Sequence, residues 1–297
     1  MRALAHVRLN KARSPLTLTS SPERIAPSAR VNGHVVILPT GQVYLSWPGL
    51  FEFRVSPQGT NITGTLEADD CLESFRAYFL GHVLSFALLR QGVEPLHGTI
   101  VVNDNNEALA LLGNSGYGKS SAAAAFLGAG YRLLSDDLLV LEQQADQAIA
   151  FPGVPRLKLF PEVADRFLGG AIQAPRMHRH FSKLLVPLGK KKFSQLPVPL
   201  RAIYVLAKPD TNAEYVTIRR LARRSAFLAV LRNTFNTKLT DSSRLRRQFE
   251  TINRLVSQVP VMTLSYPRTL DLLPEVCEAV TSDFQRRNDT QASRVAA

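Results

Sequence analysis

One glycine-rich stretch, LLGNSGYGKSSAAAAF at residues 111–126, constrains the fold of this chain more than any other part of the sequence. Residues 107–112 (EALALL) predict a short strand, and the alanine-rich residues 119–128 predict a helix that Gly128 or Gly130 can end. The glycines between them therefore fall at a strand-to-helix turn. A chain with this unit is expected to contain an α/β core.

The turn fits the pattern GxxxxGKS, because Gly113, Gly118, Lys119 and Ser120 stand at the required spacing. Glycines can take positive φ and turn successive N–H groups toward one point, where the new helix adds the positive end of its dipole. This geometry favours a polyphosphate, with Lys119 reaching the β- and γ-phosphates and the Ser120 hydroxyl on Mg²⁺. A plain glycine-rich turn is the alternative. The residues expected to bind the nucleotide are Gly113, Asn114, Ser115, Gly116, Tyr117, Gly118, Lys119, Ser120 and Ser121.

Two adjacent carboxylates interrupt the apolar run YRLLSDDLLVL at residues 131–141. The helix that begins at Lys119 carries the chain about 15 Å away, and five extended residues bring it back about 16 Å. Asp136 and Asp137 are therefore expected at the mouth of the glycine-rich turn. There one acid can hold Mg²⁺ and the other can accept a proton from an attacking hydroxyl. A turn or a helix cap made by the Asp pair is the alternative.

His97, in EPLHGTIVV, stands at the start of the preceding predicted strand. The sequence does not distinguish a structural histidine from a proton carrier at this position. The catalytic candidates are Asp136, Asp137, His97 and Lys119, and the metal candidates are Ser120 and Asp137.

Composition limits the class of protein. The chain has 297 residues, of which 45% are hydrophobic, which is enough for a main core with an accessory part. The longest apolar stretch, residues 78–89, is shorter than the about 20 apolar residues that cross a bilayer. Cys71 and Cys277 are far apart and indicate neither a zinc site nor a disulfide framework. We expect a globular cytoplasmic protein with no membrane partner, and the Arg- and Ser-rich residues 1–30 leave a transit peptide as the alternative.

The charge balance bears on partners. Thirty-six basic and 24 acidic residues give a formal net charge of +12, which raises nucleic acid as a partner. The basic clusters lack interleaved aromatic residues, so solvated faces, or steering of an acidic protein or peptide, are favoured over nucleic acid. His178 and His180 are interpreted as loop residues rather than a metal site. A homo-oligomer stays open.

The chain is expected to have three parts. Residues 30–66 hold short alternating apolar runs typical of a small β meander. Residues 70–91 carry apolar residues at helical spacing, with Asp69 or Asp70 as a cap. The predicted parts are an N-terminal β-rich region with its connecting helix at residues 1–91, a P-loop core at 92–285 and a disordered tail at 286–297.

Within the core, a late helix is expected to begin at an Asp241 cap. Leu245, Phe249, Ile252 and Val256 form an apolar stripe along it at i, i+4, i+7 and i+11. Besides the strand before the glycine-rich turn, the expected strands are residues 99–103, 138–142, 203–207 and 216–220.

The segments PLHGTIV and LLGNSGYGKSSAAAAFLGAGYRLLSDDLLVL together resemble the catalytic core of the HPr serine kinase/phosphorylase family. In that family an HG strand, a P-loop and an Asp pair come in this order at similar spacing. The clear match covers residues 97–141, and weaker similarity to HPr-kinase-related kinases of biosynthetic clusters extends through PGVPRLKLFPE and VPVMTLSYPR. The resemblance implies a P-loop kinase core of the HPr kinase/phosphoenolpyruvate carboxykinase type. It also implies nucleotide binding by residues 113–120, metal binding by Ser120, a base at Asp136 or Asp137, and His97 beside them.

The sequence also departs from that family. Bifunctional members follow the Asp pair with an E-x-R-G signature linked to the reverse, phosphorolytic reaction, and here the corresponding residues 154–160 read VPRLKLF without a glutamate. Arg156 and Lys158 are candidate phosphate ligands, or exposed cations of an ordinary strand. The N-terminal β region differs in kind from the family's usual N-terminal domain, which argues against HPr itself as the partner.

These features predict an ATP-dependent serine kinase that uses ATP and Mg²⁺ on a protein or precursor-peptide acceptor. Two alternatives stay open. One is a nucleotide-binding regulator without turnover, and the other is a small-molecule kinase or ATPase of the same fold.

Overall fold

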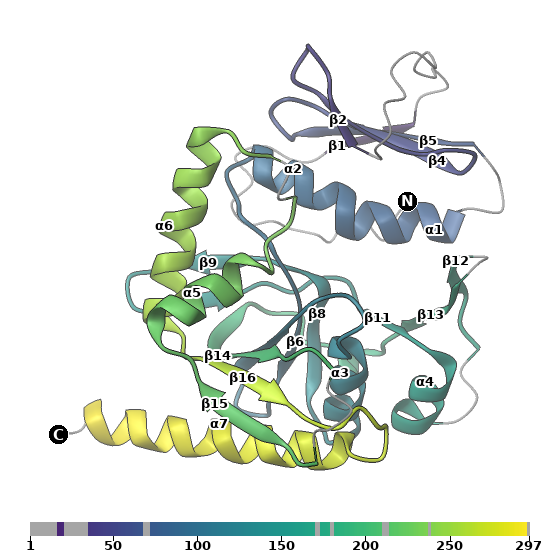
Figure 1. The fold of residues 1–297 in the computed structure, drawn as a ribbon. Coiled ribbons are helices and arrows are strands. Elements are labelled where there is room, and N and C mark those ends of the chain that lie inside the picture. The colour runs from purple at the N-terminus through teal and green to yellow at the C-terminus, as the bar shows by residue number, and fades with distance from the viewer. Residues whose placement is uncertain are drawn as a thin grey trace. The chain divides into compact units, whose positions relative to one another are not determined.

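The computed structural model describes residues 17–20, 35–67, 72–169, 173–178, 181–209, 214–236 and 239–295. The chain is a mixed α/β protein with several sheets and helices, and it divides into two compact units (Figure 1). Unit 1 comprises Met1–Pro95, Pro175–Lys183 and Phe235–Gln248, and unit 2 comprises Leu96–Ala174, Leu184–Thr234 and Phe249–Ala297. Two later segments thus belong with the N-terminal region, which differs from the contiguous division that the sequence predicts.

Unit 1 contains a five-stranded sheet that includes the predicted β meander. Neighbouring strands in this sheet are antiparallel, except that β1 runs parallel to its neighbour β5. In sheet order the strands are β1 (Thr17–Ser20), β5 (Asn61–Leu66), β4 (Phe51–Val55), β3 (Val43–Trp47) and β2 (Val35–Ile37).

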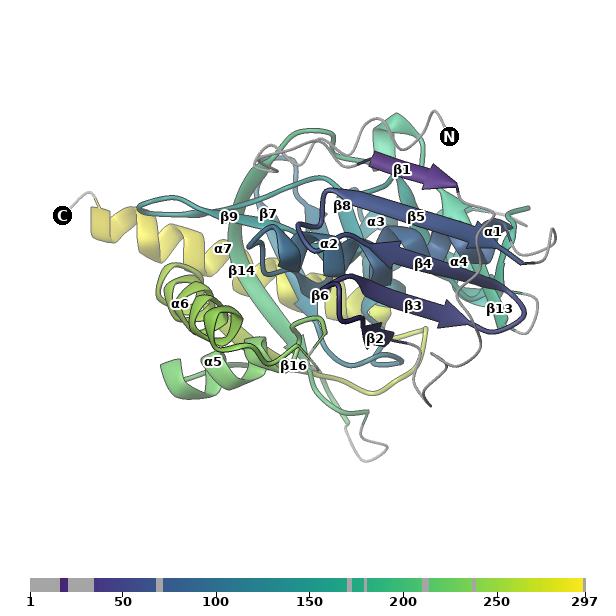
Figure 2. The same cartoon turned by 90° about the horizontal axis from the view of Figure 1, so that it is seen from above.

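A helical segment lies along one face of this sheet, as Figures 1 and 2 show. It consists of α1 (Leu72–Tyr78), the π-helical η4 (Phe79–Val83) and α2 (Leu84–Arg90), in the region where the sequence predicts a helix. Aromatic rings fill the space between helix and sheet, with Phe53 and Phe75 ring centroids 4.4 Å apart. The predicted caps Asp69 and Asp70 lie outside the described residues.

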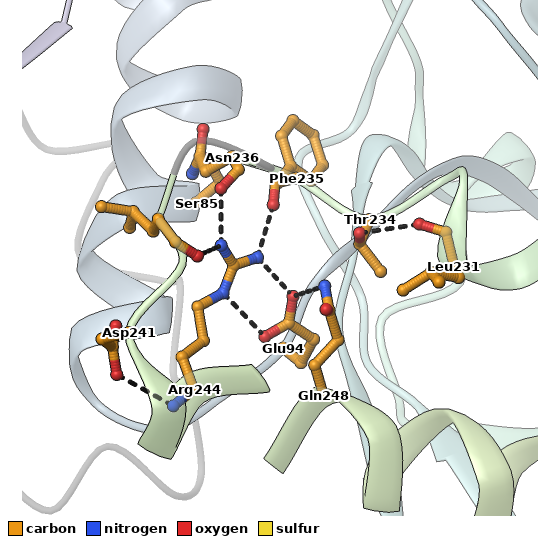
Figure 3. A network of polar contacts seen from close by, with 10 residues as sticks. Ser85, Glu94, Leu231, Thr234, Phe235, Asn236, Asp241, Arg244 and Gln248 are labelled. Carbon is orange, nitrogen blue, oxygen red and sulfur yellow. Dashed lines mark hydrogen bonds and ion pairs between the residues drawn. The ribbon is translucent and has the colours of Figure 1, made fainter. Parts of the chain in front are cut away.

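A buried ion pair holds another part of unit 1 together (Figure 3). Arg244 Nη2 lies 2.7 Å from Glu94 Oε1, and both side chains are almost fully buried. The same guanidinium donates to the backbone carbonyls of Phe235, Asn236 and Leu239. A buried arginine is tolerated when its donors are satisfied, so this residue fixes the loop before its own helix.

Arg244 lies on α6 (Ser242–Gln258), where the structure both supports and corrects the prediction. The Asp241 carboxylate accepts the backbone N–H of Arg244 at 2.9 Å, as expected of a cap. The predicted apolar stripe is buried only in its second half, because Leu245 and Phe249 are 44% and 58% exposed. In the first half of α6 the buried residue is Arg244, which pairs with Glu94. The ion pair therefore determines which face of the helix is buried there.

Unit 2 is built on a sheet of eight strands. The main path in sheet order is β15 (Thr217–Arg220), β16 (Val261–Ser265), β14 (Val198–Leu206), β7 (Ala108–Leu112), β6 (Leu96–Val102) and β8 (Arg132–Leu139). Off this path, β10 (Ala148–Ala150) pairs with β14 and with β9 (Leu141–Gln143). Strands lie where the sequence predicts them at residues 99–103, 107–112, 203–207 and 216–220. The predicted strand 138–142 is wrong, because these residues cover the end of β8, a break at Val140 and the start of β9.

Strand direction decides where the ends of these strands meet. β7, β14 and β16 are mutually parallel, and β6 runs antiparallel to both β7 and β8. The carboxyl ends of β7, β14, β16 and β8 therefore lie at the same edge of the sheet as the start of β6. In open α/β sheets this edge is where ligands bind.

Helices cover both faces of the sheet and form two apolar cores. On one face lie α3 (Lys119–Gly128), α4 (Pro161–Leu168) and α7 (Leu273–Val295), and on the other lie α5 (Arg223–Leu231) and the second half of α6. The remaining elements are β11 (Arg156–Leu159), its antiparallel partner β13 (Phe181–Pro187), β12 (Arg176–His178) and the short helix η5 (Lys190–Lys192).

The C-terminal end differs from the predicted disordered tail, because α7 continues through Val295. Residues 286–295 contain no proline or glycine, which allows the helix to continue, but they carry no apolar stripe that would have indicated it. Among the described residues, no helix is long and apolar enough to cross a bilayer.

We expect Arg244→Ala to lower the free energy of unfolding of unit 1 by about 3 to 5 kcal/mol, because it leaves the Glu94 carboxylate buried and unpaired. Arg246→Ala, an exposed position on the same helix, is the matched control. The measurement is urea denaturation of both variants. Equal midpoints for the two would contradict the role given to the ion pair.

Candidate functional site

The site is organised around β6, the strand between the glycine-rich turn and the Asp pair. Gly98 of β6 is in register with Leu112 on one side and with Asp137 on the other. A Cβ at Gly98 would lie 2.5 Å from the Leu112 side chain, so glycine leaves the space that this side chain fills. The Asp pair thus returns to the edge where the turn begins, as the sequence predicts.

The turn between β7 and α3 has the backbone that its glycines predict. Gly113, Gly116 and Gly118 have φ of 146°, 82° and 90°, all in the region that favours glycine. Gly118 is the N-cap of α3 and supplies no side-chain cap for the first N–H groups of the helix. Asn114 and Ser115 are exposed on the turn.

Lys119 begins α3 and is buried. Its ammonium donates to the carbonyl of Gly113 at 2.7 Å and to that of Asn114 at 3.1 Å. The turn therefore encloses its own cation, which two of its backbone carbonyls hold in place. Ser120 and Ser121 follow on the first turn of α3, and both are half-buried.

The Asp136 carboxylate accepts hydrogen bonds from three different elements. Thr99 Oγ1 of β6 donates to Oδ1 at 2.7 Å, and Ser120 Oγ of α3 donates to the same oxygen at 3.2 Å. The backbone N–H of Lys158, on β11, donates to Oδ2 at 3.1 Å. The sequence predicts Ser120 and Asp137 as the metal candidates, whereas in the structure the Ser120 hydroxyl contacts Asp136.

Asp137 has an unusual backbone and a different partner. Its φ is +69°, which is uncommon for a residue other than glycine and costs about 1 kcal/mol or more. Its carboxylate forms an ion pair with the Lys158 ammonium, and its side chain remains 23% exposed. Strain of this kind is often retained at functional sites.

The two carboxylates differ in acidity because their surroundings differ. Burial raises the pKa of Asp136, and the adjacent charge of Asp137 raises it further. Burial also acts to raise the pKa of Asp137, but the Lys158 ammonium outweighs it and brings that pKa below the ordinary value. One carboxylate is thus fixed as an anion by a lysine, while the other holds its proton more readily.

His97 lies beside this pair. Its ring Nδ1 is 3.2 Å from the Asp137 backbone carbonyl, and its backbone N–H donates to the Asn233 carbonyl at 2.7 Å. Burial lowers the pKa of the imidazole, and the positive charge of Lys119 lowers it further. The ring is therefore neutral at pH 7.

Asn233, which the sequence did not indicate, joins the two sides of the site. Its side-chain oxygen accepts the N–H of Gly113 at 2.8 Å, and its amide donates to the Ala229 carbonyl of α5 at 2.8 Å. Since its backbone also binds His97, one residue positions the start of the glycine-rich turn and the start of β6. It follows α5 in a segment with no motif of its own, so only the folded chain reveals it.

Two further residues had weak signals in the sequence. Lys158, considered above as a phosphate ligand or an exposed cation, instead pairs with Asp137. Arg268 stands in the quoted segment VPVMTLSYPR, and it lies against Gly118 in the structure. Thr99 lies within the segment PLHGTIV, where no sequence signal marks it as a site residue.

Two histidines, His178 and His180, are interpreted as loop residues from the sequence. His178 ends β12 and packs against the ring of Phe181, with centroids 5.3 Å apart, and His180 lies outside the described residues. Within the described ranges no group of three or more His, Cys, Asp or Glu side chains is arranged to hold a metal.

Comparison with known proteins adds a distant structural relationship. No family model matches the chain, and no curated protein matches it. Among solved structures, it is similar to the Hpr(Ser) kinase/phosphatase from Coxiella burnetii, with 14% sequence identity and a TM-score of 0.37. The similarity covers 66% of this chain and 98% of that one. A similarity of this size carries no argument about activity.

The His97 environment predicts a titration that NMR can follow. Because the folded-state pKa of His97 is lowered, its imidazole should stay neutral as the pH falls through the pKa of the unfolded chain. The stability that the neutral ring contributes is then lost as the pH falls further, through the folded-state pKa. Ring nitrogen shifts should show a lower midpoint in the folded protein than in urea. Lys119→Ala should raise the folded midpoint, and equal midpoints in folded and unfolded protein would refute the account.

Proposed function

We propose that this chain is an ATP-dependent kinase that transfers the γ-phosphate of ATP to a serine-type hydroxyl of a protein or peptide. The observation that carries the proposal is the contact of Ser120, within the GxxxxGKS segment, with Asp136 of the Asp pair at 3.2 Å. A glycine-rich phosphate loop alone indicates binding. A phosphate loop joined to two carboxylates of different acidity has the parts that phosphoryl transfer requires.

The turn fits a nucleoside triphosphate. Its three positive-φ glycines, the uncapped start of α3 and the Lys119 ammonium all favour phosphate oxygens. The carbonyls of Gly113 and Asn114 hold the ammonium in place, and its exchange to the β- and γ-phosphates would replace neutral acceptors by anionic ones.

Ser120 and Asp136 would hold Mg²⁺, because a hydroxyl and a carboxylate already within hydrogen-bond distance suit a hard cation that keeps several waters. When bound, the metal would neutralise charge on the transferring phosphates. The raised pKa of Asp136 would fall with a cation beside it.

Asp137 would then act on the acceptor. The acceptor oxygen forms a bond to the γ-phosphorus, the bond from that phosphorus to the β,γ-bridging oxygen breaks, and the acceptor proton passes to Asp137. Lys158 holds Asp137 as an anion before the transfer and supplies a positive charge next to the phosphoryl group. His97 stays neutral and orients the strand that carries the Asp137 carbonyl.

The direction and acceptor class follow from other features. Residues 154–160 carry no glutamate that could return a proton to a leaving serine, which favours the forward reaction. The formal charge of +12 favours an acceptor segment with acidic residues.

Lys119→Ala should weaken ATP binding by about 1.5 to 3 kcal/mol, or about 10- to 150-fold, because a charge-assisted contact to phosphate is lost. Lys191→Ala, an exposed lysine of η5, is the matched control. Isothermal titration of both variants with Mg·ATP tests this, and unchanged affinity in Lys119→Ala would remove the phosphate-loop assignment.

Substitution of each carboxylate should separate their roles. Asp137→Asn should lower turnover by about 10²-fold or more with little change in ATP affinity, as expected of a general base. Asp136→Asn should instead raise the Mg²⁺ concentration needed for half-maximal activity. Labelled ATP with the peptides and proteins encoded beside this chain provides the assay.

Two outcomes would point to the other functions. Nucleotide binding without phosphotransfer to any acceptor, in the native protein and in both variants, would favour a regulator without turnover. Transfer only to small molecules or to water would favour a small-molecule kinase or an ATPase.

A further inference from the structure

Arg268 lies at the same sheet edge as the glycine-rich turn but has no part in the reaction described above. It follows β16, whose carboxyl end meets that of β7 because both run parallel to β14. Its Nη2 donates to the Ala207 carbonyl at 2.9 Å, and its Nη1 donates weakly to the Tyr266 hydroxyl at 3.4 Å. The guanidinium is thus held in a fixed place at this edge.

That place is directly on the turn. A Cβ at Gly118 would lie 2.6 Å from Arg268 Nη1 and 3.2 Å from the Tyr266 hydroxyl, so the guanidinium fills the space above this glycine. Gly118 is the N-cap of α3. Arg268 therefore places a positive charge at the positive end of a helix dipole, close to the residue that precedes Lys119.

The guanidinium is also short of partners. Within the part of the chain that the structure describes, no carboxylate lies within ion-pair distance of Arg268, and the ionisable side chains that act on it are two neutral tyrosines, Tyr266 and Tyr117. Its Nε is shielded from solvent and has no hydrogen-bond acceptor among these residues. The rings of Tyr266 and Tyr117 lie 4.7 Å and 5.9 Å from its central carbon.

This arrangement is unfavourable for the protein alone. A half-buried guanidinium normally pairs with an acid, because its desolvation is otherwise uncompensated. Beside the Arg268 guanidinium lies the N-terminus of α3 and not an acid. An anion bound between the guanidinium and the turn would satisfy both, and an arginine can bind phosphate with two parallel N–H donors.

We propose that Arg268 binds the phosphate groups of the nucleotide, as a second cation that acts from the loop after β16 while Lys119 acts from within the turn. This inference rests on the proposed function. Tyr117 and Tyr266 hold the guanidinium plane in position, and the bound polyphosphate supplies the negative charge that the protein lacks at this point. Arg268 is a binding residue in this account and takes no proton.

The test compares Arg268→Gln, Arg268→Lys and the control Arg254→Gln, which changes an exposed arginine of α6. Isothermal titration with ATP and with inorganic tripolyphosphate, each with Mg²⁺, should give affinities about 10- to 100-fold lower in Arg268→Gln for both ligands. Arg268→Lys should recover part of the loss, since it keeps the charge without the planar fork. Arg254→Gln should match the native protein.

Each outcome decides the question. Native affinity in Arg268→Gln, with lost affinity in Lys119→Ala, would overturn this inference and leave the proposed function intact. Loss for ATP but not for tripolyphosphate would place Arg268 on the nucleoside and would also overturn it. If native protein binds neither ligand, the proposed function fails first. If Arg268→Gln does not fold, the Nε resonance of Arg268 in native protein should shift on tripolyphosphate binding, and an unmoved resonance at saturation would refute the contact.

Discussion

The Asp136 carboxylate is the constraint on which the candidate site depends. It accepts hydrogen bonds from Thr99, Ser120 and the backbone of Lys158, which belong to three elements far apart in the sequence. A carboxylate partly removed from water is stable only when such donors surround it, so these contacts fix α3 and β11 against β6. The same contacts hold one carboxylate oxygen beside the first turn of α3. The structural role of Asp136 and its proposed role in metal binding therefore fall on the same side chain.

Several groups at this edge are arranged at a cost to the protein alone. Asp137 has a left-handed backbone next to a second acid, Lys119 is enclosed by its own loop, and Arg268 faces a helix N-terminus. By contrast, the buried guanidinium of Arg244 in unit 1 is paired with Glu94 and donates to three backbone carbonyls. Asp137, Lys119 and Arg268 thus mark a part of the molecule where the arrangement lowers the stability of the protein alone. Binding of an anion and a cation there would compensate for that loss of stability.

Local patterns predicted the strand, turn and helix around residues 108–128, because glycine spacing and an alanine-rich helix act over short distances. The return of the Asp pair followed from helix and strand lengths alone. Long-range choices could not be predicted in this way. The burial of Arg244 in place of Leu245 and Phe249 depends on Glu94, which lies 150 residues away in the chain. Asn233 and Arg268 likewise acquire their positions only when β6 and β16 have taken their places in the sheet.

The central claim is that one site holds a nucleoside triphosphate against the Asp pair. A crystal structure with Mg²⁺ and a non-hydrolysable ATP analogue tests it most directly. We expect the β- and γ-phosphates on the N–H groups of residues 114–121, the Lys119 ammonium moved from the loop carbonyls to phosphate oxygens, and the metal between Ser120 and Asp136. A triphosphate bound away from this turn, or an unchanged Lys119 at saturating analogue, would contradict the account.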